Sequence, residues 1–299
     1  VLVLEKALSI RTLNRLVLLA VVPIMAAGCG GSIKTTTRVP AAEVRPSLEA
    51  TADQLMERYN QQARAVRSLN AGVELNPVAG STYTGVIEDY HDVRGFILAQ
   101  RPANIRMIGQ APVVAKNIFD MVSDGETFRI FIPSKNKFVV GPTELERPAK
   151  KPIENLRPQH LLDALFWKEL PASNTVLFEE FDAAPARYYI LTQVRQADGM
   201  EIARRIWFDR VDLSIARIQV YGTRGRLLAD IRYADWQPAG ELRYPRHMWL
   251  VRPHDDYQLE VRITKLTLNE DIAAERFRLE QPPGTELVRV GEEGKEARP

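Results

Sequence analysis

Residues Tyr257–Leu268 read YQLEVRITKLTL, and this stretch decides the fold class. From Tyr257 to Ile263 apolar side chains alternate with polar ones, the period of two that is typical of a β-strand with one dry and one wet face. The alternation slips at Thr264-Lys265 and resumes at Leu266. This slip predicts a β-bulge.

Other parts of the chain repeat the same pattern. Alternating runs occur at residues 128–132, 218–220 and 227–233. Turn sequences lie between such runs, at Asp124-Gly125, Asp198-Gly199 and Thr223-Arg224-Gly225. Because Asp-Gly and similar pairs favour tight hairpin turns, we expect one large antiparallel sheet.

Two stretches replace the strand pattern by helical spacing. Residues 47–69 have an apolar stripe opposite charged residues, and Ser47 is placed to cap the helix. Residues 153–170 form the second stretch, which Pro158 is expected to divide into two short pieces. We therefore predict an α+β, mainly β, fold: a strongly curved single sheet, or unclosed antiparallel β-barrel, with a helical lid.

The N-terminal segment has the pattern of a bacterial export signal. Lys6, Arg11 and Arg15 precede an apolar core at residues 16–27, which is too short to cross a bilayer of about 30 Å as a helix. The motif Ala26-Ala27-Gly28-Cys29 resembles a lipobox. That resemblance implies cleavage before Cys29 and attachment of diacylglycerol and an N-acyl chain, such as palmitate, to this residue. An ordinary secretory signal cut near Gly28 is the alternative.

Cys29 is the only cysteine of the chain, so no disulfide within one chain is available. No Asp follows Cys29, and for a lipoprotein this favours the outer membrane, facing the periplasm, over the inner one. The expected organisation is a signal peptide (1–28), a lipidated cysteine with a flexible tether (29–46), one domain (47–290) and a disordered tail (291–299).

The charge of the chain gives no sign of nucleic-acid binding. The whole chain has a net charge of +2. Residues 1–28 hold three cations and one anion, so the remainder is formally neutral. The basic isoelectric point is therefore no evidence for nucleic-acid binding, and we expect no nucleic-acid partner.

Three short motifs follow one another in a distinctive order. Residues 95–102 read GFILAQRP, an apolar strand that ends in Arg-Pro; residues 122–127 read VSDGET; and residues 277–285 read FRLEQPPGT. In order and spacing, residues 47–290 resemble the LolA/LolB-type lipoprotein-carrier superfamily. Its members are unclosed antiparallel barrels whose helices lie across the opening as a lid.

The resemblance implies functional residues. Arg101 matches the arginine that hydrogen-bonds helix carbonyls and helps to hold the lid shut; the alternative is a strand-end arginine paired with a surface carboxylate. An apolar cavity would hold acyl chains, at about 0.8 kcal/mol for each buried methylene. Ten residues are expected to line it: Phe96, Leu98, Ile105, Met107, Phe128, Ile130, Ile218, Val220, Leu259 and Val261. For each, packing in an ordinary core is the alternative.

Motifs for catalysis or metal binding do not occur. The histidines are scattered, at positions 91, 160, 247 and 254, without zinc-ligand spacing, and no nucleophile elbow, P-loop or dinucleotide fingerprint is present. We expect a protein that is not an enzyme and has no metal or cofactor besides its lipid. The four tryptophans, Trp167, Trp207, Trp236 and Trp249, either pack within the fold or form a carbohydrate-stacking platform.

Two functional hypotheses follow. The first is an outer-membrane-anchored periplasmic lipoprotein that binds acyl chains of a lipid or lipoprotein for transfer or sensing, with a periplasmic carrier or envelope complex as its partner. The second is a structural or accessory lipoprotein with a filled core, which docks an envelope assembly or a cell-wall polysaccharide.

Overall fold

The computed structural model describes residues 46–81, 85–89, 93–111, 116–143, 157–171, 175–183, 186–197 and 199–290. The chain divides into two compact units, Val1–Arg45 and Pro46–Pro299, and every described residue belongs to the second. The predictions for the signal peptide, Cys29, the tether and residues 291–299 therefore lie outside the described residues.

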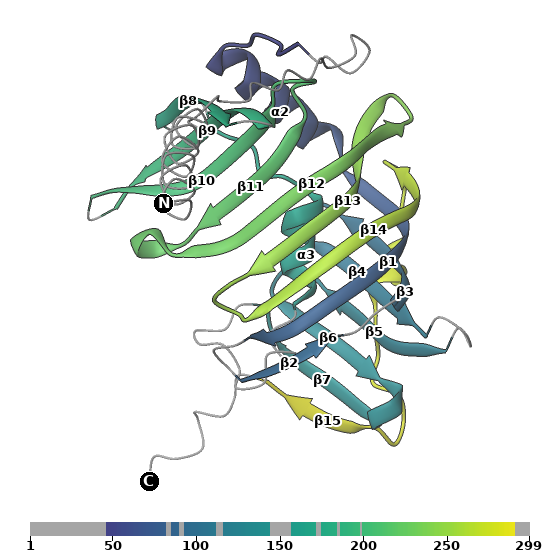
Figure 1. Cartoon of the computed structure of the whole chain (residues 1–299). Coiled ribbons are helices and arrows are strands. Elements are labelled where there is room, and N and C mark those ends of the chain that lie inside the picture. The colour runs from purple at the N-terminus through teal and green to yellow at the C-terminus, as the bar shows by residue number, and fades with distance from the viewer. Residues whose placement is uncertain are drawn as a thin grey trace, which may run out of the picture. The chain divides into compact units, whose positions relative to one another are not determined.

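One sheet contains all strands of the described residues (Figure 1). In spatial order these are β15 (Glu286–Arg289), β7 (Lys137–Pro142), β6 (Thr127–Ile132), β5 (Asn117–Ser123), β4 (Asn104–Gln110), β3 (Val93–Gln100), β1 (Ser68–Ser81), β14 (Tyr257–Leu268), β13 (Leu242–Arg252), β12 (Leu227–Ala239), β11 (Ile215–Tyr221), β10 (Met200–Asp209), β9 (Ala186–Gln196) and β8 (Thr175–Ala183). A further strand, β2 (Val86–Asp89), pairs with the end of β1. Apart from the parallel pair β15–β7, these neighbours are antiparallel, and the order has two ends, as an unclosed barrel requires.

The predicted β-bulge is confirmed. In the pair β1–β14, Gly72 lies opposite Lys265 and Val73 lies opposite Ile263, so Thr264 is the extra residue. A Cβ at position 72 would lie 3.2 Å from the Thr264 hydroxyl. Glycine therefore suits the strand facing the bulge.

Helix α2 (Ala52–Ala65) begins later than the sequence pattern predicts. Its N-cap is Thr51, which forms a capping box with Gln54: each side chain accepts from the other residue's backbone N–H. The prediction that Ser47 caps the helix is wrong. The segment before Thr51 is instead attached to the sheet, since Leu48 N–H donates to Arg210 O at 2.6 Å.

Helix α3 (Pro158–Leu165) has Pro158 at its first position, so this proline starts a helix, and the division into two helical pieces stays a prediction. The part of the predicted segment before Arg157 lies outside the described residues. The described residues also contain three short 3₁₀ segments: η2 (Pro133–Lys135), η4 (Thr223–Gly225) and η5 (Ala274–Phe277).

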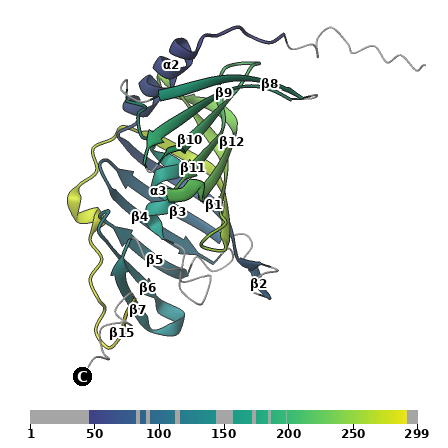
Figure 2. The same ribbon diagram turned by 90° about the vertical axis from the view of Figure 1, so that its left-hand side faces the viewer.

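The two helices cover one face of the curved sheet, as predicted. Figure 2 shows α3 inside the curve, and it packs against β4 and β5. We call this face, which carries Ile97 and Val261, the inner face; both side chains are fully buried. The outer face is the opposite one, where the C-terminal segment crosses the sheet: Ser68 Oγ donates to Glu270 O and Arg106 to Arg276 O.

None of the helices in the described ranges is both long and apolar enough to cross a membrane.

Candidate functional site

The inner face carries two apolar rows, one on each side of the β1–β14 pair, and the strand register defines each row. The first row crosses β6, β5, β4, β3 and β1 through Ile130, Met121, Met107, Ile97 and Ala71. The second crosses β14, β13, β12, β11, β10 and β9 through Leu259, Leu250, Ile231, Ile218, Ile206 and Leu191. Each row is a continuous apolar strip perpendicular to the strands.

Eight of the predicted lining residues lie on this inner face. They are Ile105, Met107, Phe128, Ile130, Ile218, Val220, Leu259 and Val261. All are buried except Ile130 and Val220, which are partly buried. Contact of these residues with a ligand stays a prediction.

Phe96 and Leu98 are wrongly predicted, because they lie on the outer face. Strand side chains alternate, and Ile97 between them points inward. Phe96 is 52% exposed. Leu98 is 6% exposed, and its register partner Arg106 bonds to the C-terminal segment that crosses this face. Burial of Leu98 therefore comes from the outside.

Side chains of α3 and of the turn after it cover the inner rows. Trp167 is the centre, with four aromatic rings at centroid distances of 5.6–6.4 Å. Its indole N–H donates to the Tyr233 hydroxyl, which donates to Ala164 O, and the Tyr244 hydroxyl donates to Leu165 O. Burial raises the pKa of the Tyr233 and Tyr244 phenols, so both remain donors. The described inner face is therefore covered in this conformation.

Arg101 joins both helices to the sheet. Its Nε donates to Val66 O, and its Nη2 donates to Ala63 O and Trp167 O, each at 2.9 Å. The guanidinium also lies over the Phe166 ring, 5.1 Å from its centroid. Burial lowers the Arg101 pKa, and the charge of Glu169 opposes this effect. These acceptors are backbone carbonyls at the end of α2 and just after α3, which are the contacts that the resemblance implies; a lid-holding role stays a prediction.

Three further charged or titratable side chains lie on the helix-covered side of the sheet. Arg204 donates to the Tyr59 hydroxyl and to Lys168 O. The Arg157 side chain, 4% exposed, lies over the Phe128 ring at 4.6 Å. His160 lies between Tyr257 and Arg252, with ring nitrogens 2.6 Å from the hydroxyl and 3.2 Å from the guanidinium. Burial, then the charges of Arg252 and Arg157, hold the His160 pKa well below its ordinary value.

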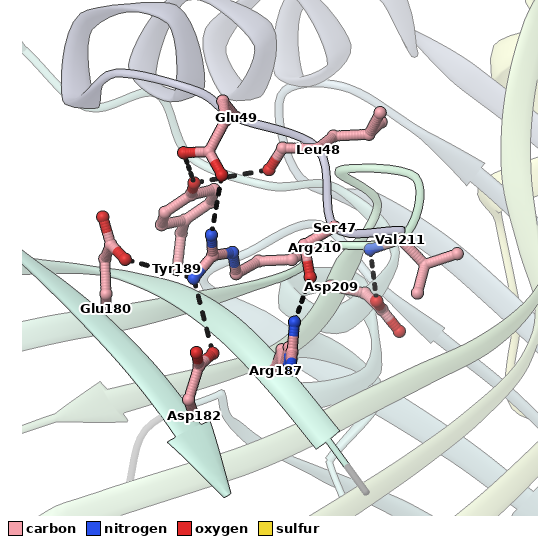
Figure 3. A network of polar contacts seen from close by, with 10 residues as sticks. All are labelled: Ser47, Leu48, Glu49, Glu180, Asp182, Arg187, Tyr189, Asp209, Arg210 and Val211. Carbon is pink, nitrogen blue, oxygen red and sulfur yellow. Dashed lines mark hydrogen bonds and ion pairs between the residues drawn. The ribbon is translucent and has the colours of Figure 1, made fainter. Parts of the chain in front are cut away.

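The segment before α2 is fixed to the sheet by a second arginine (Figure 3). Arg210 forms ion pairs with Glu49, Glu180 and Asp182 at 3.1–3.4 Å and lies over the Tyr189 ring at 4.5 Å. The Tyr189 hydroxyl donates to Glu49, so this strand tyrosine also touches the segment. These contacts fix Leu48 and Glu49 against the sheet.

Sequence reasoning missed the polar contacts that attach the lid to the fold. Asn60 on α2 bonds both the N–H and the C=O of Leu170, and the Tyr59 hydroxyl donates to Lys168 O. No spacing rule indicates these pairs, because they join positions more than a hundred residues apart. Within the described ranges, no group of three or more His, Cys, Asp or Glu is arranged to hold a metal ion.

The fold and this site define a class: an open antiparallel half-barrel with helices over its inner face. Comparison with solved structures finds the following similar proteins. The chain is similar to a LolA superfamily protein from Nitrosomonas europaea (12% identity, TM-score 0.46, covering 77% of this chain and 99% of the other). It is also similar to a DUF1329 family protein from Desulfovibrio piger (11%, 0.48, 75% and 94%). A third is a putative outer membrane lipoprotein-sorting protein domain from Vibrio parahaemolyticus (9%, 0.45, 76% and 97%).

One of these structures bears the name of the superfamily that the sequence motifs resemble. At these identities the likeness is one of fold alone. No protein-family model and no curated protein sequence matches the chain.

Proposed function

We propose that this protein is a non-enzymatic carrier or sensor that binds acyl chains of a lipid or lipoprotein on its inner face. In this proposal α2 and α3 form a movable lid, and Arg101 is the latch. Cys29 would carry the lipid anchor in the outer membrane, with the domain in the periplasm and residues 29–46 as a tether.

One observation carries the proposal. Two apolar rows cross most of the sheet, and two short helices, α2 with 14 residues and α3 with 8 residues, lie over them. The latch acts through hydrogen bonds to backbone carbonyls, each of which contributes about 1 kcal/mol net. By contrast, a palmitoyl chain with about 14 methylenes gains on the order of 10 kcal/mol on burial. Burial of an acyl chain can therefore offset the loss of the latch hydrogen bonds.

A second candidate function is a docking lipoprotein with a filled core. Two observations favour it: Trp167 packs among four aromatic rings on the inner face, and the buried cation of Arg157 lies over Phe128. Acyl chains on the inner face would have to displace the Trp167 ring and lie near the buried Arg157 cation.

The test is native mass spectrometry with lipid extraction, on residues 46–299 produced in the periplasm without detergent. This part is a compact unit of its own and can be made without residues 1–45. A double variant, Ile218→Thr with Val220→Thr, makes the inner face more polar. The matched control, Phe96→Thr with Leu98→Thr, makes the same kind of change on the outer face.

We expect lipid to co-purify with the wild-type unit and with the outer-face control, and to decrease in the inner-face variant. Thermal melts establish that each variant folds. A unit that is empty and takes up no added dipalmitoyl lipopeptide would reject the carrier proposal and favour the docking function.

A further inference from the structure

The outer face has a pocket on the opposite side of the sheet from the proposed acyl-chain surface. Its volume is about 590 Å³. Strand register explains which side chains meet there. One row joins Asn76, Glu260, Trp249 and Arg232 across β1, β14, β13 and β12. A second row joins Asp89, Val78, Gln258 and Val251 across β2, β1, β14 and β13. All eight residues line the pocket.

The pocket combines one aromatic ring with groups that both donate and accept hydrogen bonds. Trp249 is partly exposed and contacts the His247 ring, with a centroid distance of 3.6 Å. Arg232 and Gln258 are exposed. Within the described ranges, neither the Trp249 indole nor the polar groups of Arg232 and Gln258 have a hydrogen bond or ion pair. The side chains of Trp249, Arg232 and Gln258 are thus free to contact a ligand.

Glu260 supplies a fixed acceptor in the same row. His247 and Arg262 contact one of its carboxylate oxygens at 2.6 and 2.8 Å, and Asn76 donates to the other at 3.1 Å. Burial opposes ionisation, yet these hydrogen bonds keep the pKa of Glu260 below its ordinary value. The carboxylate is therefore ionised and held in place near Trp249.

We propose that this pocket binds an uncharged saccharide, with a pyranose ring against Trp249 and its hydroxyls on Glu260, Gln258 and Arg232. A pyranose has an apolar C–H face, which fits an aromatic ring, and a rim of hydroxyls that both donate and accept. Neighbouring strands are about 4.8 Å apart, so one sugar ring reaches from Trp249 to Arg232 on one side and to Glu260 on the other. This site goes beyond the acyl-chain function and does not depend on it.

The charges of the pocket favour an uncharged saccharide over a charged one. The lining holds the carboxylates of Glu260 and Asp89 and the guanidinium of Arg232, and Arg262 adds a second guanidinium 2.8 Å from the Glu260 carboxylate. With two carboxylates and two guanidinium groups there, a polyanion such as an oligogalacturonate or a nucleic acid gains no net electrostatic attraction. Sugar hydroxyls, in contrast, donate well to carboxylates.

The test titrates residues 46–299 with tetra-N-acetylchitotetraose, maltotetraose and tetragalacturonate, and follows the ¹⁵N-labelled tryptophan indole signals by NMR. Trp249→Leu removes the ring and keeps an apolar strand residue. Arg232→Ala changes an exposed cation that no fold contact uses. Arg129→Ala is the matched control, since Arg129 is an exposed strand arginine on the outer face of β6, outside the pocket.

We expect one of the neutral tetrasaccharides to shift the Trp249 indole signal, and tetragalacturonate not to. Affinity should fall at least about tenfold in Trp249→Leu and about threefold in Arg232→Ala, and stay unchanged in Arg129→Ala. The proposal is overturned if neither neutral sugar binds at millimolar concentration, if tetragalacturonate binds more tightly, or if both pocket variants keep wild-type affinity. Thermal melts show whether each variant folds. If Trp249→Leu does not fold, the affinity of Arg232→Ala for the sugar decides the test.

Discussion

Phe128 and Phe96 lie on opposite faces of one sheet, and their exposed fractions are 1% and 52%. The tryptophans divide in the same way: Trp167 and Trp236 contact each other on the inner side, whereas Trp207 and Trp249 lie on the outer rows. Both faces thus carry large apolar residues. The comparison teaches that composition does not decide which face is the core; the helices that cover one face do.

The largest expected effect comes from a charge placed on the inner face. Val261→Glu would bury a carboxylate at a position that is fully buried, and we expect a loss of about 4 kcal/mol or more in the free energy of unfolding. Urea titration followed by circular dichroism measures it. Phe96→Glu is the outer-face control and should change that free energy by no more than about 0.5 kcal/mol. Equal losses in both variants would contradict the assignment of the two faces.

The latch gives the next largest effect. Arg101→Leu leaves the carbonyls of Ala63, Val66 and Trp167 without their donor, which should cost about 2–4 kcal/mol. Hydrogen exchange should also become faster at the end of α2. Arg106→Leu is the control, because Arg106 serves the outer face through Asp120 and the C-terminal segment. If α2 exchanges equally fast in both variants, Arg101 is no specific latch.

Gly95 tests how closely the strands approach beside Phe96. A Cβ at Gly95 would lie 2.5 Å from Ile108 O, a backbone atom that cannot turn away. Gly95→Ala should therefore lower the unfolding free energy by roughly 1–3 kcal/mol, seen as a lower melting temperature. Gly199→Ala, where a Cβ meets no atom within 4 Å, should leave the melting temperature nearly unchanged. A Gly95→Ala protein as stable as wild type would show that β3 and β4 can separate.

The smallest expected effect is a pH dependence. Arg252 can only donate, so His160 Nε2 accepts and the Nδ1–H donates to Tyr257, which fixes a neutral imidazole. Since the folded pKa lies well below 6.5, only the unfolded chain binds this proton as the pH falls below about 6.5, and folding stability decreases there. His160→Gln should remove this part of the decrease in urea titrations between pH 5 and 8. A wild-type slope in His160→Gln would refute the assignment.

Much of the fold follows from the sequence, because alternation and turn chemistry are local. The Thr264 bulge shows this, since the pattern slips at the residue that the register leaves unpaired. The α2 start was missed although Thr51 and Gln54 have the capping-box spacing. Leu48 fits the apolar stripe of the helix, so the stripe favoured a start at Ser47 over the capping box at Thr51. Here Leu48 lies next to the helix in sequence but is bound to Arg210.

The site was harder to predict. Residues 96–99 are apolar at four consecutive positions, so alternation cannot tell which of these side chains points to the inner face. In addition, Leu98 is buried although it lies on the outer face. The outer pocket could not be predicted at all. It depends on the register of five strands, which brings Asn76, Arg232 and Trp249 together from distant parts of the chain.

Photo-crosslinking at the two phenylalanines tests the central claim most directly. Benzoylphenylalanine replaces Phe128 in one protein and Phe96 in the other, and each folded protein is irradiated with a dipalmitoyl lipopeptide and analysed by mass spectrometry. The acyl-chain account predicts a lipid adduct at position 128 and little or none at position 96. An adduct at position 96 alone, or none at either position, would contradict it.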